Sequence, residues 1–137
     1  MEIIFTQLNP HACRTYLIEN PRTKEAVLID PVLDHVPDYL KLLQTKKLIL
    51  STTIDTHTHA DHLSGSSALL DHLSIEYLMH EKSEAACPTS RIHDGDKRNL
   101  AGVSVTFIET PGHTKDSISI LLPGKILTGD ALFLDEA

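Results

Sequence analysis

The stretch Thr56-His57-Thr58-His59-Ala60-Asp61-His62 places three histidines and one aspartate within six consecutive positions, 57 to 62. Imidazole nitrogens and carboxylate oxygens are ligands that zinc and non-haem iron prefer. If residues 48–54 form a strand, the following segment starts extended, and the side chains of His57 and His59 then point to the same side. Asp61 and His62 come as the chain turns toward a predicted helix, so they face a neighbouring position. The pattern predicts two half-sites for metal, side by side.

Two more potential ligands follow predicted strands later in the chain. His113 lies in the tight loop Thr110-Pro111-Gly112-His113-Thr114, and Asp130 follows Gly129 at the end of a hairpin. Ligands gather at strand ends in α/β folds, and the two oxygens of Asp130 could bind one metal ion each. Taken singly, such residues are more often surface loop side chains. Their common position at strand ends favours a metal site made of His57, His59, Asp61, His62, His113 and Asp130.

The other histidines and the two cysteines do not lie in such clusters of potential ligands. The histidines at positions 11, 35, 72, 80 and 93 are interpreted as ordinary surface or packed side chains. Cys13 is expected to be a small buried hydrophobic residue, and Cys87, in a polar loop, could be exposed. Asp55 either orients a ligand histidine from outside the coordination sphere or is a solvated loop carboxylate.

Length and composition narrow the class of protein. With 137 residues, the chain has the size of one domain, which we place over residues 1–137. Its net charge of -7 argues against nucleic-acid and anionic-membrane partners. No apolar run approaches the roughly 20 residues of a membrane helix, and the N-terminus lacks a signal-peptide pattern. Because two cysteines do not suggest a disulfide framework, the expected location is the cytoplasm.

Hydrophobic periodicity predicts an α/β fold, a mixed sheet with flanking helices. Residues 3–8, 14–18 and 26–29 are predicted to form a three-strand meander at the sheet edge. A helix over 34–45, with its apolar residues spaced as on one helical face, leads to the strand at 48–50 and implies a parallel crossover. The later predictions are helices at 64–73 and 81–86, strands at 75–79 and 103–108, and a hairpin of 117–122 with 125–128. Gly65 is expected to let the backbone come close to the metal loop.

Read together, the motifs at 56–62, 110–114 and 128–130 resemble those of the metallo-β-lactamase superfamily. Within it, the chain is similar to the persulfide dioxygenases and the glyoxalase II thioesterases, and residues 13–18 and 24–32 are similar to the persulfide dioxygenase branch. The resemblance implies an αββα sandwich. It also implies that the C-terminal part of the family fold is absent here, with its later ligand histidine and the residues that hold glutathione.

The resemblance implies two alternative metal sites. In the persulfide dioxygenases, two histidines and one aspartate hold a single iron, and they match His57, His113 and Asp130, which leaves positions open for dioxygen and a thiol-bound substrate. His59, Asp61 and His62 would then order water and substrate, with Asp61 and His62 as the catalytic candidates. In the glyoxalase II arrangement, His57, His59 and His113 hold one zinc, Asp61 and His62 hold a second, and Asp130 bridges them. A bridging hydroxide would attack the thioester.

Three functions therefore stay open at the level of sequence. The first is an iron-dependent dioxygenase that converts a glutathione-type persulfide into sulfite and the thiol. The second is a thioester hydrolase with one or two zinc ions. The third is an inactive, metal-binding half-domain. The expected partner is a small thiol, persulfide or thioester, and an uncovered sheet face with open strand edges predicts a homo-oligomer.

Overall fold

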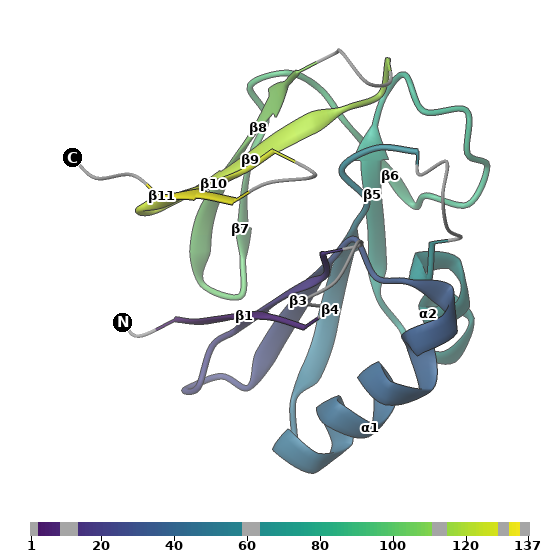
Figure 1. The fold of residues 1–137 in the computed structure, drawn as a ribbon, viewed down its shortest axis with the longest axis vertical. Helices are drawn as coiled ribbons and strands as arrows, with labels where there is room; N and C mark the ends of the chain where they lie inside the picture. Colours follow the sequence, from purple (N-terminus) through teal and green to yellow (C-terminus); the bar gives the residue numbers. More distant parts are fainter. Residues whose placement is uncertain (1–2, 9–13, 59–63, 111–114, 129–131, 135–137) are drawn as a thin grey trace.

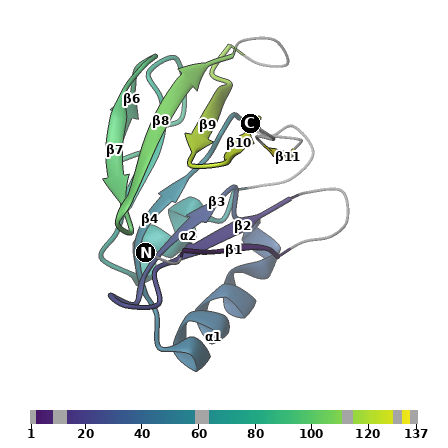
Figure 2. The same ribbon diagram turned by 90° about the vertical axis from the view of Figure 1, so that its left-hand side faces the viewer.

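The computed structural model describes residues 3–8, 14–58, 64–110, 115–128 and 132–134. Two β-sheets lie face to face, and the two α-helices cover the side of the first sheet that faces away from the second (Figure 1). The view turned by 90° shows the same layering (Figure 2). No helix in the described part of the chain is long and apolar enough to cross a lipid bilayer.

The first sheet carries the strand that leads to the histidine motif. Its strands lie in the order of the chain: β1 (Ile4–Gln7), β2 (Tyr16–Glu19), β3 (Glu25–Ile29), β4 (Ile49–Ile54), β5 (Glu76–His80) and β6 (Ser90–Ile92). The first three pair antiparallel, which confirms the predicted meander, and the pairs from β3 to β6 are parallel. β3 is an almost continuous apolar run because both its faces are buried, Val27 and Ile29 between the sheets and Ala26 and Leu28 under the helices.

Helix α1 (Val36–Lys46) provides the predicted crossover between β3 and β4. A short 3-10 helix, η1 (Leu33–His35), precedes it, and Lys47 ends it in the left-handed conformation, with a φ of 57°. Val36, Tyr39 and Leu43 are its buried residues, as the periodicity predicts. Helix α2 (Ser66–His72) packs on the same side through Leu69, which is fully buried.

The second sheet is an antiparallel meander. Its strands are β7 (Lys97–Leu100), β8 (Val103–Glu109), β9 (Ile118–Leu122), β10 (Lys125–Leu127) and β11 (Leu132–Leu134), with the order β11-β10-β9-β8-β7. Phe107, Ile120 and Leu127 face each other across three strands and are buried in the core between the sheets. On the opposite face, Leu121 pairs with Thr106 and Ile126 and is 40% exposed. Within the described residues, no helix covers this outer face (Figure 1).

The predicted helix over residues 81–86 is wrong. This segment consists of turns and irregular backbone. The guanidinium of Arg91 donates hydrogen bonds to the carbonyl oxygens of Ser83 and Ala85, and the Ser83 hydroxyl accepts from the Ala85 N–H. These side chains form hydrogen bonds with backbone groups that would pair with each other in a helix. Strands β6 and β7 were not predicted, because the polar sequence Lys97-Arg98-Asn99-Leu100 shows no clear alternation.

Candidate metal site at the end of β4

The residues that follow β4 are buried and lead directly to the histidine motif. Asp55, Thr56 and His57 are 2%, 1% and 7% exposed. Strand β3 ends beside them at Asp30, whose backbone has a φ of 55° and whose N–H donates to the carbonyl of Ile54 at 2.8 Å. The parallel pairing of β3 and β4 therefore brings the carboxylate of Asp30 to the start of the motif.

Asp30 holds Thr56 at two points. The Thr56 N–H donates to Asp30 Oδ1 at 2.8 Å, and the Thr56 hydroxyl donates to Asp30 Oδ2 at 2.7 Å. Thr56 Oγ1 also lies 3.0 Å from Nδ1 of His57. The single hydroxyl proton points to the carboxylate, so the hydroxyl oxygen accepts from His57 Nδ1–H. The lone pair of His57 is thereby assigned to Nε2.

This tautomer suits a metal ligand. A ligating histidine commonly donates its second ring N–H to a polar group, which fixes the orientation of the ring. The chain of contacts from Asp30 through Thr56 to His57 does this within a buried region. The donor set at His57 therefore fits a metal such as iron or zinc, bound through Nε2.

Thr58, on the other side of His57, is held by the turn that precedes β9 of the second sheet. Its N–H donates to Asp116 Oδ1 at 3.1 Å, and its hydroxyl donates to Asp116 Oδ2 at 2.5 Å. The N–H of Ile118 donates to the carbonyl of Thr56 at 2.8 Å. The start of the histidine motif thus lies against residues 116–118, which follow closely after the predicted ligand loop at 110–114.

The chain before that loop is bonded to the chain that follows it. The Thr110 N–H donates to the carbonyl of Ser117 at 3.0 Å, and the hydroxyls of Thr110 and Ser119 are 3.1 Å apart. Residues 110 and 117 are therefore neighbours, and both flank the segment that contains His113.

Asp55 stabilises the strand end rather than contacting solvent. Its carboxylate accepts hydrogen bonds from the hydroxyls of Ser66 in α2, at 2.9 Å, and Tyr77 in β5, at 2.6 Å. Burial raises the pKa of Asp55 to about 6, and the negative charge of Asp30 adds to the shift. Burial, and then the charge of Asp55, raises the pKa of Tyr77 well above its usual range. The alternative of a solvated loop carboxylate is wrong.

Gly65 was predicted to let the backbone approach the metal loop, whose residues 59–63 lie outside the described residues; the close approach that the structure shows is to Val32 and Val36. A Cβ at this position would lie 2.9 Å from Cγ2 of Val36 and 3.0 Å from the carbonyl oxygen of Val32. The Gly65 N–H donates to the carbonyl of Pro31 at 2.8 Å. Glycine is needed because the backbone here packs closely on residues 31–36, the segment between β3 and α1.

Of the six predicted ligands, the structure describes His57. The other five, His59, Asp61, His62, His113 and Asp130, lie outside the described residues, as do His11 and Cys13. Within the residues that are described, no three His, Cys, Asp or Glu side chains lie close enough together to hold a metal ion. Cys87 is exposed, as expected, and His80 is a fully buried packed histidine.

Three residues that support the site were not predicted: Asp30, Thr56 and Asp116. Asp30 comes directly after the apolar strand β3, and Thr56 comes two residues after the end of β4; this position at a strand end is the signal in the sequence that could have indicated them. Asp116 gave no comparable signal, because its partner Thr58 is 58 positions away.

Comparison with known proteins gives consistent matches. Residues 8–137 match the metallo-beta-lactamase superfamily. The chain is 34% identical over 128 residues to the mitochondrial persulfide dioxygenase ETHE1 of Homo sapiens, covering 91% of this chain and 50% of that protein. It is 28% identical over 118 residues to a hydroxyacylglutathione hydrolase of Idiomarina loihiensis, covering 86% of this chain and 46% of that protein.

The crystal structure of ETHE1 from Myxococcus xanthus aligns with a TM-score of 0.86 at 36% identity, covering 98% of this chain and 59% of that one. The chain spans about half the length of the curated relatives it matches.

Proposed function

The chain belongs to the metallo-beta-lactamase superfamily, and we propose that it is an iron-dependent dioxygenase that acts on glutathione-type persulfides. The observation that carries the metal dependence is the buried His57, whose Nδ1–H is held by Thr56, itself bonded to Asp30, so that Nε2 can bind a metal. The similarity to human persulfide dioxygenase supports the choice of reaction. The products would be sulfite and the thiol.

We propose His57, His113 and Asp130 as the ligands of a single iron. Such a ligand set leaves coordination positions open, and the bound metal would supply the site where dioxygen and a sulfur substrate meet. His59, Asp61 and His62 would order water and substrate, with Asp61 and His62 acting on the substrate. Thr56 and Asp30 would keep the ring of His57 in its binding orientation, as partners of ligating histidines do.

A metal-dependent thioester hydrolase is the second candidate, because the chain is also similar to a hydroxyacylglutathione hydrolase. In this arrangement one or two zinc ions would be bound by His57, His59 and His113 and by Asp61 and His62, with Asp130 between them. The same tautomer of His57 serves either metal, so the geometry at Thr56 does not favour one reaction over the other.

The metal content and the reaction separate these candidates. We expect about one iron per chain by elemental mass spectrometry, and oxygen uptake with glutathione persulfide. His57→Ala should lose both, whereas His72→Ala, at an exposed position on α2, should change neither. Zinc near two per chain, with hydrolysis of lactoylglutathione and no oxygen uptake, would establish the hydrolase instead. Bound metal with neither activity would support the inactive half-domain.

We also propose that the chain forms a homo-oligomer through the outer face of the second sheet. Leu121 lies on this face, with Thr106 and Ile126 beside it. Leu121→Lys should shift the mass measured by light scattering toward the monomer, because a charge would be buried in an apolar contact. A monomer at micromolar concentration in the unmodified protein would contradict the proposal. The cytoplasmic location stays a prediction.

A further inference from the structure

A pocket of about 340 Å³ opens beside the histidine motif. It is lined by Thr58, Lys82, Glu84, Ala85, Lys115 and Asp116. These residues come from three separate segments: the end of β4, the irregular segment after β5, and the turn before β9. A molecule in this pocket would contact Thr58, the residue that directly follows the candidate metal ligand His57. We call it the lysine pocket.

The charged groups around the lysine pocket differ in how freely they can reach a bound molecule. Asp116 is buried, and both of its carboxylate oxygens accept hydrogen bonds from Thr58. Lys82, Lys115 and Glu84 are exposed and can turn toward a bound molecule. Two ammonium groups therefore border a pocket in a chain whose net charge is -7. A carboxylate is the complementary group, and Glu84 adds a position where an ammonium group of the same molecule could bind.

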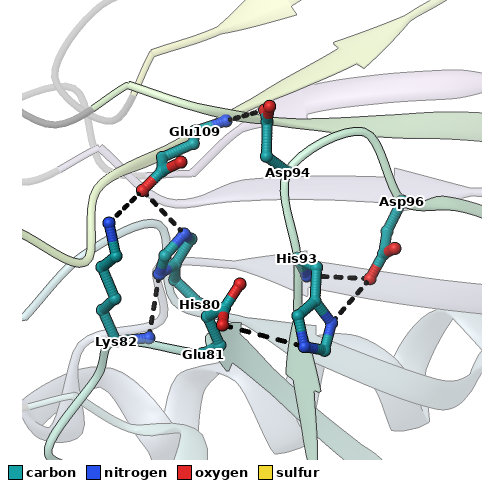
Figure 3. Close-up of polar contacts among 7 residues, drawn as sticks. All are labelled: His80, Glu81, Lys82, His93, Asp94, Asp96 and Glu109. Atoms are coloured by element: carbon teal, nitrogen blue, oxygen red, sulfur yellow. Dashed lines mark hydrogen bonds and ion pairs between the residues drawn. The ribbon is translucent and has the colours of Figure 1, made fainter.

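Lys82 already contacts a carboxylate in this structure. Its Nζ lies 2.6 Å from Oε1 of Glu109, the last residue of β8 (Figure 3). The Lys82 side chain is 55% exposed, and exposed ion pairs are weak. Lys82 can therefore leave Glu109 for a carboxylate in the pocket, provided that Glu109 keeps another donor.

His80 supplies that second donor. Its Nδ1 accepts the Lys82 backbone N–H at 2.9 Å, so the neutral ring carries its proton on Nε2 (Figure 3). Nε2 is fully buried, has no hydrogen-bond partner among the described residues, and lies 3.6 Å from the same Oε1 of Glu109. A buried donor without a partner is unfavourable. When Lys82 leaves, a small shift of Glu109 would let its carboxylate accept from His80.

We propose that the lysine pocket binds a carboxylate of the substrate through Lys82 and Lys115. On binding, Glu109 exchanges its ion pair with Lys82 for a hydrogen bond from Nε2–H of His80. The inference rests on the proposed function, because it makes the pocket the site for the non-reacting end of a thiol-derived substrate. It assigns recognition of that end to residues within this chain. Lys82 and Lys115 are specificity-determining residues in this scheme, and His80 is a positioning residue.

Binding of glutathione, measured by calorimetry on the protein as purified, tests the proposal. We expect glutathione to bind about tenfold more tightly than its diethyl ester, in which both carboxylates are blocked. Lys82→Met and Lys115→Met should each weaken glutathione binding about fivefold to tenfold. Lys97→Met, at an exposed lysine on β7 away from the pocket, is the matched control and should bind as the unmodified protein does.

A second measurement reports on His80 directly. In protein labelled with ¹⁵N-histidine, the Nε2–H proton of His80 should move downfield on addition of glutathione, as its contact with Glu109 shortens. Glu109→Gln should reduce this shift. A purely structural role of His80 predicts no change in its signal.

The outcomes distinguish this inference from the proposed function. Binding that depends on the lysines and the carboxylates supports the inference, even if no oxygen uptake is found. Oxygen uptake with unchanged affinity in both lysine variants overturns the inference and leaves the dioxygenase intact. Equal binding of glutathione and its diester, or no binding of glutathione, also overturns it.

Discussion

Two buried polar clusters lie near the histidine motif, and they differ in how completely their groups are paired. At the end of β4, Thr56 contacts both Asp30 and His57, with contacts of 2.7–3.0 Å. At the ends of β5 and β8, His80 Nε2 finds no hydrogen-bond partner in the part of the chain that the structure describes, and a carboxylate oxygen of Glu109 lies 3.6 Å away.

The difference separates a fixed site from one that can rearrange. A buried polar network with its contacts made is rigid, because moving any member breaks a hydrogen bond that water cannot replace. That suits the proposed role of His57 as a metal ligand, which requires one orientation of the ring. The cluster at His80 and Glu109 keeps an unpaired donor and an exposed lysine, so a shift of one carboxylate can improve its pairing. Three substitutions test this contrast.

Thr56→Val should have the largest effect. Valine keeps the branched shape but removes the hydroxyl, which leaves Asp30 Oδ2 and His57 Nδ1–H without this partner. We expect a loss of about 2–3 kcal/mol in the free energy of unfolding and a metal affinity about 10–100-fold lower. Urea denaturation and metal titration measure the two effects.

Thr53→Val is the matched control for Thr56→Val. Thr53 is also fully buried, on β4, but its hydroxyl has no hydrogen-bond partner within the described ranges. Replacing it should leave stability unchanged or raise it, with no change in metal affinity. An equal loss in both variants would show that the volume and shape of threonine, rather than the contact with Asp30, stabilise this strand.

Tyr77→Phe should have an intermediate effect. The change removes the hydroxyl that donates to Asp55 at 2.6 Å and keeps the ring. We expect a loss of about 1–2 kcal/mol in the free energy of unfolding, measured by urea denaturation at neutral pH. Tyr16→Phe serves as the control, because the buried hydroxyl of Tyr16 has no hydrogen-bond partner among the residues that the structure describes, and its loss should cost little. The opposite ranking of the two variants would contradict this account of Asp55.

His80→Asn should have the smallest effect, within about 1 kcal/mol. The Oδ1 atom of asparagine can accept from the Lys82 N–H in place of Nδ1 of His80, and the unpaired Nε2 is removed. His80→Leu removes the acceptor as well and should lose about 1–2 kcal/mol more. Urea denaturation of both variants measures the difference. An equal loss in the free energy of unfolding for the two variants would contradict this role of His80 Nδ1.

Much of the local structure could be predicted from the sequence. Helix α1 ends at Lys46, one residue after its predicted end at Thr45. The prediction succeeded because Val36, Tyr39 and Leu43 repeat at helical spacing along a continuous segment. The irregular backbone of the segment 81–86 could not be predicted, because two of its carbonyl groups, at Ser83 and Ala85, accept hydrogen bonds from Arg91, which lies outside the segment. Strand β7 forms because β8 is available to pair with it, and its own residues carry little preference.

The sequence by itself was enough to predict a metal site and its candidate ligands, because histidines and aspartates at strand ends can be read along the chain. It also determined the family, through three short motifs, each made of neighbouring residues. Only the tertiary structure decided what holds His57, since Thr56 meets Asp30 across 26 positions and Thr58 meets Asp116 across 58. Hydrogen bonds form between atoms that are close in space, and such closeness exists only after the two sheets have packed.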